Sequence, residues 1–314
     1  MACIILGSYM VRFPLGGYLS WVLQWLVGFR QLGHDVYFVE KSGWPNSCFD
    51  PSKGVMTDDC SYGTAAVNTL LARFDLQGKW CFVDTQERYH GLSREQVEVI
   101  FKSAALFIDM GTHGTWLEEA AHTGLRVLLD GEPGATQMKM EQRLEAGELL
   151  PYYDYYYTVG RNIGTDSSMA PTAGKQWHPV FYPVHTALFP AQPARIEAPF
   201  TTVMSWQAHE PIEFEGTTYG QKDVEFVKFL DLPRRTLAPL EIAVAGKNVP
   251  VEQLAGAGWC VRDAHAVTLS FDSWQAYIQA SKGEFSVCKN VFVAMKGRDP
   301  MFPVKMRNER GSLI

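Results

Sequence analysis

The chain has 314 residues, of which 46% are hydrophobic, 13% aromatic and 20% charged. This length predicts two domains, and the composition excludes an intrinsically disordered chain, because enough apolar area is available to offset the entropy lost on folding. The net charge of −6, from 34 acidic and 28 basic residues without a basic stripe, argues against nucleic acid as a partner.

The apolar runs and the cysteines indicate the compartment. No apolar run approaches the ~20 residues of a membrane-spanning helix, and no signal peptide opens the chain. The six cysteines include no CxxC pair, so their spacing predicts neither a zinc site nor a redox motif. We therefore expect a soluble cytoplasmic protein with reduced thiols and no transmembrane segment.

The first half of the chain alternates short apolar runs with helical patterns. Residues 3–9 predict a buried strand, residues 18–32 carry apolar side chains at helical spacing, and residues 35–40 predict the next strand. The alternation continues with strands at 79–84, 105–109, 125–130 and 154–158 and helices at 93–102, 115–123 and 137–147. This order predicts a parallel, doubly wound sheet.

The second half repeats the alternation after a proline-rich stretch. Strands are predicted at 200–206, 240–245, 259–262 and 285–293, and helices at 223–230, 251–257 and 271–281. We expect an N-terminal Rossmann-like domain over 1–165, a Pro-rich linker over 166–199, a partial C-terminal Rossmann-like domain over 200–297 and an irregular tail over 298–314.

Ligands of open parallel sheets bind beyond the carboxyl ends of the strands, so polar residues there are the candidates for a site. Gly16 and Gly17 would let an anionic group approach a helix N-terminus, or they only permit a tight turn. His113, between two glycines, has a side chain suited to a general base, or it is structural. Asp130 and Glu132 are candidates for a base or for binding substrate hydroxyls, or they belong to an ordinary turn.

Three further candidates lie in the second half of the chain. Trp206 follows its first predicted strand, and Lys222 opens a helix where it could meet a phosphate or simply be solvated. Glu284 could hold a ribose or sugar hydroxyl. The sequence contains no GxxxxGK[ST], HExxH, GxSxG or EF-hand pattern, so nucleotide hydrolysis, zinc proteolysis and esterase chemistry lack their usual signals, and no metal site is predicted.

Several stretches resemble one known group of proteins. GSYMVRFPLGGYLSWVLQWLVGFRQLGHDVYFVE looks like the opening of GT-B-fold glycosyltransferases, and DGEPGATQMKM, YDYYYTVGRNIG, PFTTVMSW, YGQKDVEFVKFLDLP and SKGEFSVCKN are similar to later segments of that group. The resemblance covers residues 1–296. It implies two Rossmann-like domains, with a nucleotide-sugar donor bound mainly by the second and an acceptor bound mainly by the first, without a cofactor or an obligatory metal.

The resemblance also implies roles for the candidate residues. Positions that match the donor-binding side are Gly16, Gly17, Trp206, Lys222 and Glu284. Positions that match the strand-end cleft, and that we expect to be catalytic, are His113, Asp130 and Glu132. Among these, His113 or Asp130 is the expected base that deprotonates the acceptor hydroxyl.

The C-terminal part departs from the pattern of the group, because the turn, helix and strand that complete its donor pocket do not follow residue 294. We therefore expect transfer of a sugar from a nucleotide sugar to an unknown acceptor, with two alternatives. One is a catalytically inactive truncated remnant that binds a ligand or partner, and the other is a nucleotide-sugar epimerase. A sheet cut short leaves an unpaired edge and an exposed apolar helix face, which predicts a homodimer or marginal solubility through residues 285–293.

Overall fold

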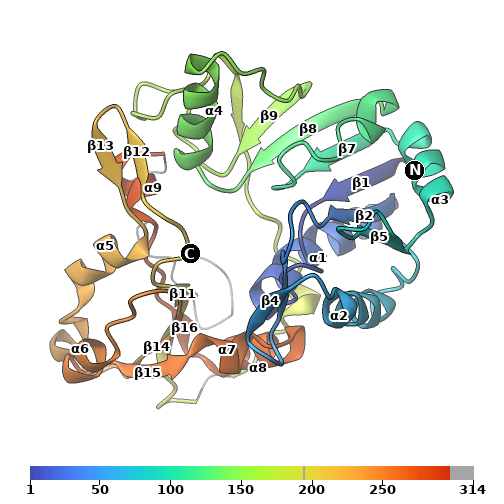
Figure 1. Ribbon diagram of the computed structural model, residues 1–314. Coiled ribbons are helices and arrows are strands. Elements are labelled where there is room, and N and C mark those ends of the chain that lie inside the picture. Colours follow the sequence, from blue (N-terminus) through green and yellow to red (C-terminus); the bar gives the residue numbers. More distant parts are fainter. Residues whose placement is uncertain (194, 298–314) are drawn as a thin grey trace.

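The computed structural model describes residues 1–193 and 195–297, so the tail expected at 298–314 lies outside the described residues. Two sheets form two lobes, seen at the upper right and lower left of Figure 1. The larger sheet has the strand order β10-β9-β8-β7-β1-β2-β5-β6, and all its neighbouring strands are parallel except β5 and β6. Its strands are β1 (Cys3–Gly7), β2 (Asp35–Lys41), β5 (Trp80–Val83), β6 (Tyr89–Gly91), β7 (Leu106–Asp109), β8 (Leu125–Asp130), β9 (Tyr155–Thr158) and β10 (Trp177–Pro179).

Helices cover both faces of this sheet, as a doubly wound fold requires. They are α1 (Gly16–Gln31), α2 (Ser61–Ala72), α3 (Arg94–Ser103) and α4 (Ala135–Glu145). Successive side chains of β1 point to opposite faces: Ile4 shares a buried cluster with Leu23 of α1, whereas Ile5 shares one with Phe101 of α3. The crossing direction reverses between β1 and β7, which is where ligands of such sheets bind.

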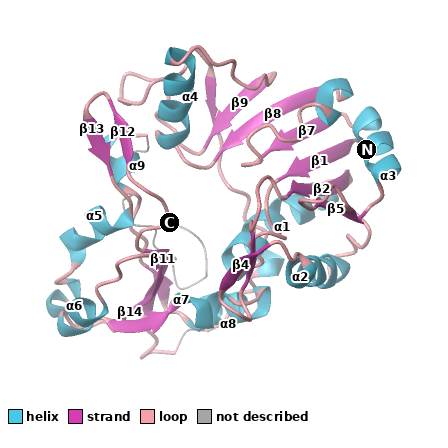
Figure 2. Cartoon of the chain, in the orientation of Figure 1, coloured by secondary structure: helices cyan, strands magenta, loops and turns pink. Residues whose placement is uncertain are grey.

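The second lobe contains a smaller parallel sheet with the order β15-β14-β11-β16. Its strands are β11 (Phe200–Ser205), β14 (Leu240–Ala245), β15 (Cys260–Asp263) and β16 (Gly283–Glu284). Its helices, cyan in Figure 2, are α5 (Lys222–Phe226), α6 (Val251–Gly256), α7 (Ala264–Thr268), α8 (Phe271–Ala280) and α9 (Asn290–Ala294). Two antiparallel hairpins, β3 (Cys48–Asp50) with β4 (Val55–Thr57) and β12 (Ile212–Phe214) with β13 (Thr217–Tyr219), complete the described elements. The expected class of two Rossmann-like parallel sheets is confirmed.

Two predicted elements are wrong. Residues 285–293 were expected as a strand, but β16 ends at Glu284 and α9 begins at Asn290. The Asn290 side chain accepts the Gly220 N–H at 3.0 Å and donates to Glu225 at 2.8 Å, while Val291 is buried. These contacts favour a helix, and the strand edge from which the homodimer was argued is reduced to the 2 residues of β16. The helix expected at 115–123 is a series of turns ending in a 3-10 helix over Glu119–His122.

Residues 166–199, which were expected to form a linker, include the strand β10. This strand lies parallel to β9 and is the outermost strand of the larger sheet. The sequence signal was hidden by the surrounding prolines, since β10 has only three residues and ends at Pro179. Within the described ranges, no helix combines the length and apolarity that crossing a bilayer would need.

The N-termini of α1 and α8 lie against each other where the lobes meet, near the lower centre of Figure 1. A Cβ added to Gly16 would lie 2.2 Å from Trp274 Cβ and 2.5 Å from the Ser270 carbonyl oxygen. Arg73 at the end of α2 adds an ion pair of 2.7 Å with Asp272. The absence of a side chain at Gly16 therefore lets the two helices approach.

Candidate active site at the facing sheet edges

The loops after the carboxyl ends of the two sheets meet. Glu132 follows β8 of the larger sheet and Lys289 follows β16 of the smaller one, and their Oε2 and Nζ atoms are 2.6 Å apart. The Lys289 side chain is only 14% exposed, whereas that of Glu132 is 50% exposed. His209, which follows β11, lies near enough to both for their charges to influence its ring. A site between the lobes thus has contributions from both sheets.

His113 is presented by a tightly held loop after β7. The buried carboxylate of Asp109 accepts the N–H groups of Gly111, Thr112 and Gly114 at 3.1, 2.7 and 2.9 Å. It also accepts the Tyr153 hydroxyl at 2.6 Å. These bonds hold His113 at a φ of 55°, a left-handed conformation that a residue other than glycine adopts only when its surroundings impose it. Asp109 therefore positions His113 at the exposed end of the loop.

Loss of hydration favours the neutral form of both His113 and His209. Surrounding protein reduces the hydration of the His113 ring and so lowers its pKa; the Asp109 charge opposes this shift, and Lys139 adds to it. Loss of hydration likewise lowers the pKa of His209, and Lys289 and Lys139 lower it further. Both rings keep contact with solvent. A neutral imidazole at neutral pH can accept a proton, as a general base must.

The base role predicted for Asp130 does not fit its surroundings. Its Oδ1 accepts the Glu132 N–H at 2.8 Å and the Thr136 hydroxyl at 2.6 Å. Its Oδ2 accepts the Gln137 amide at 3.0 Å and the Thr158 hydroxyl at 2.7 Å. With 4% of its surface exposed and both oxygens occupied, Asp130 shapes the β8–α4 loop that carries Glu132.

An aromatic group surrounds the first-lobe side of the site, and the sequence analysis missed it. Tyr9 packs edge-on against Tyr18 with ring centroids 5.1 Å apart, and Trp21 lies 5.8 Å from Tyr9 and 5.9 Å from Tyr182. Loss of hydration among the surrounding rings raises the pKa of Tyr9 and of the partly exposed Tyr18, and the nearby negative charge of Glu132 raises both further. The sequence does show this group as aromatic residues repeated on either side of Gly16 and Gly17.

The loop between β1 and α1 is shaped by a buried ion pair that was also missed. Glu40, at the end of β2, accepts the N–H groups of Met10, Val11 and Arg12 at 2.8, 2.7 and 3.1 Å. The Arg12 Nε lies 3.0 Å from Glu40 Oε1, and the two side chains are 7% and 0% exposed. The signal in the sequence was Glu40, a carboxylate that directly follows the apolar residues of the predicted strand.

The predicted donor-binding residues are not gathered in one place. Gly16 faces α8, whereas a Cβ at Gly17 would meet no atom within 4 Å. Trp206 is 5% exposed and packs in the core of the second lobe, with its ring 5.5 Å from the Phe226 ring, which does not suit donor binding. Lys222 opens α5 and Glu284 ends β16, and the roles of these two residues and of Gly17 stay predictions.

Comparison of the sequence with protein-family models and with curated proteins finds no match. Among solved structures, the chain is similar to an alpha-glucosyltransferase in complex with UDP and a 13-mer DNA containing a central A:G mismatch, with a TM-score of 0.49 and 8% identity over 91% of this chain and 71% of that one. It is also similar to Acinetobacter baumannii MurG, with a TM-score of 0.33 and 10% identity over 93% of this chain and 74% of that one. Both scores are below 0.5, so the fold assignment depends on the strand orders described above.

Proposed function

We propose that this protein transfers a sugar from a nucleotide-sugar donor to an acceptor hydroxyl between its two lobes. The observation that carries the proposal is the 2.6 Å contact between Glu132 and Lys289, which brings the carboxyl-edge loops of two Rossmann-like sheets together. Such edges are where parallel sheets bind small molecules, so two facing edges suit a reaction between two substrates. The resemblance of residues 1–296 to GT-B-fold glycosyltransferases supports the same reaction.

Each residue of the site has one role in the proposed reaction. Lys289 exchanges its contact with Glu132 for one with the donor diphosphate, and its positive charge stabilises that group as it leaves. The acceptor oxygen forms a bond to the anomeric carbon while the bond from that carbon to the diphosphate breaks. Neutral His113 takes the proton of the acceptor hydroxyl. The exposed ring of Tyr18 offers a stacking surface for an acceptor sugar.

The proposal is tested by calorimetry with UDP-, GDP- and dTDP-sugars, followed by mass spectrometry of products formed with simple alcohol and sugar acceptors. We expect Lys289→Gln to weaken donor binding at least tenfold, and Lys282→Gln, which removes a lysine just before the amino end of β16, to leave it unchanged. We expect His113→Asn to keep donor binding but to lower turnover by about 10² or more.

Three results would contradict transfer. Absence of heat with every donor would exclude a nucleotide-sugar enzyme. Binding without any product would favour the remnant that only holds a ligand. A donor whose sugar is changed while it stays attached to the nucleotide would identify an epimerase.

A further inference from the structure

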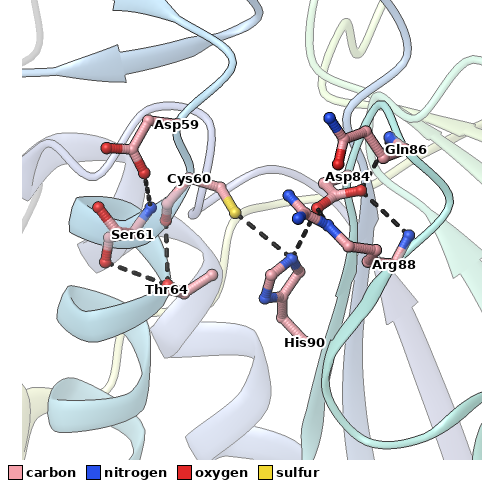
Figure 3. A network of polar contacts seen from close by, with 8 residues as sticks. All are labelled: Asp59, Cys60, Ser61, Thr64, Asp84, Gln86, Arg88 and His90. Carbon is pink, nitrogen blue, oxygen red and sulfur yellow. Dashed lines mark hydrogen bonds and ion pairs between the residues drawn. The ribbon is translucent and has the colours of Figure 1, made fainter.

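Three potential metal ligands converge beside the outer strands of the larger sheet, on different elements from the site between the lobes. Cys60 precedes the first turn of α2, Asp84 directly follows β5, and His90 lies in β6 (Figure 3). His90 Nε2 is 3.5 Å from Cys60 Sγ and 2.9 Å from Asp84 Oδ2. All three atoms lie within 4.8 Å of one another.

The geometry argues against a thiol nucleophile activated by a histidine and an aspartate. Such a relay uses both ring nitrogens, one toward the nucleophile and one toward the carboxylate. Here Cys60 and Asp84 both approach Nε2 of His90, so one nitrogen would have to serve both partners.

We propose that Cys60, Asp84 and His90 bind one divalent transition-metal ion of the Zn²⁺ type. Zn²⁺ prefers sulfur, imidazole nitrogen and carboxylate oxygen as ligands, and one of each converges here. Mg²⁺ and Ca²⁺ prefer oxygen alone. Three protein ligands leave the fourth tetrahedral position open to water. His90 is half-buried, so solvent reaches this position.

The neighbouring contacts of Asp84 suit this role. Its Oδ1 accepts the N–H groups of Gln86 and Arg88 at 2.8 and 3.0 Å, which fixes the carboxylate with Oδ2 toward His90. Arg88 Nε also lies 2.7 Å from Oδ2, but its side chain is 64% exposed and can turn into solvent when the ion binds. Arg88 is thus a competitor of the metal.

Binding is coupled to protons and to the local fold. The Cys60 thiol releases one proton and the resulting thiolate forms the metal–sulfur bond, so affinity should rise with pH. The bound ion would join the start of α2, the end of β5 and the β5–β6 hairpin, and should raise the midpoint of thermal unfolding. None of this depends on the proposed transferase activity.

The test is a titration of the full chain with Co²⁺, which reports thiolate ligation by a near-ultraviolet charge-transfer band and tetrahedral geometry by intense visible bands. We expect both to saturate at one ion per chain and to vanish on addition of Zn²⁺. Cys60→Ser should abolish the charge-transfer band, and Cys260→Ser, which removes an exposed thiol elsewhere, should keep it. Arg88→Gln should tighten binding several-fold.

Absence of the charge-transfer band in the unaltered chain, or its persistence in Cys60→Ser, would overturn the proposal. A second measurement avoids variants altogether: Zn²⁺ should protect Cys60 of the unaltered protein from alkylation, with modification mapped by mass spectrometry and Cys260 as the internal reference. Equal alkylation of Cys60 with and without Zn²⁺ would also overturn it.

Discussion

Replacing Gly16 by alanine should separate the two lobes or destabilise their contact. The added Cβ would lie 2.2 Å from Trp274 Cβ, about 1.2 Å short of the 3.4 Å at which ordinary contact begins, and 2.5 Å from a backbone oxygen of Ser270 that cannot turn away. Overpacking of this kind costs about 1–3 kcal/mol. Gly16 is the first residue of α1, so alanine gains little of the advantage of about 1 kcal/mol that it has over glycine in a helix interior. We therefore expect a net loss of about 1–3 kcal/mol.

Thermal unfolding and small-angle scattering measure this effect. A loss of that size should lower the unfolding midpoint by about 2–5 °C, because the unfolding entropy of a 314-residue chain corresponds to about 1.5 °C per kcal/mol. If the helices part instead, the radius of gyration should rise. The matched control is Gly17→Ala on the same helical turn, where the added Cβ meets no atom and stability should stay equal or rise by up to about 1 kcal/mol. Identical behaviour of the two variants would refute the close α1–α8 contact.

Three further predictions concern charged groups. Glu40→Gln should lower the free energy of unfolding in urea by about 3–5 kcal/mol, because it leaves Arg12 buried without its counter-charge. A decrease below about 1 kcal/mol would contradict this. A double-mutant cycle of Glu132→Gln and Lys289→Gln should give a coupling free energy of unfolding of only about 0.2–1 kcal/mol, because Glu132 is half exposed. This coupling should shrink in high salt, and a coupling that does not depend on salt would argue against the ion pair. The folded-state pKa of His113 is below its ordinary 6.5, so the unfolded chain binds more protons and stability should fall as the pH drops through 6.5 toward the lower folded value. His113→Asn, which tolerates the left-handed backbone, should flatten that slope in urea titrations between pH 8 and 5, and an unchanged slope would contradict the assignment.

Local patterns predicted most of the scaffold. The apolar run before Gly7 and the apolar run that ends at Glu40 became neighbouring parallel strands in the expected order. The helix expected over 93–102 is α3, and Ser93 caps it, since its hydroxyl accepts the Gln96 N–H. The segment after Glu284 was not predictable in this way, because its apolar residues suit a strand or a helix equally. Contacts with residues far away in the sequence, such as that between Asn290 and Gly220, decide between them.

The site was predictable only as a set of loops. The rule that ligands bind at strand ends indicated the loops of His113 and Glu132, but not which side chains within them are free to react. Asp130 is saturated by hydrogen bonds from Thr136, Gln137, Thr158 and a backbone amide, and only the folded geometry reveals this. Lys289 is 157 residues from its partner, so no local pattern could pair them.

The same limit applies to the proposed metal site. The sequence analysis found no metal-binding spacing, because Cys60, Asp84 and His90 come from a helix start, a strand end and a hairpin rather than from a compact motif. Their convergence arises from the pairing of β5 with β6 and from the placement of α2 against β6.

Hydrogen–deuterium exchange with and without nucleotide-sugar donors tests the central claim most directly. The account predicts slower exchange in peptides from both lobes at once: residues 110–114 and 131–134 of the first, and residues 206–210 and 286–290 of the second. Protection confined to one lobe, or lying on strands away from these loops, would contradict a site formed between the two facing sheet edges.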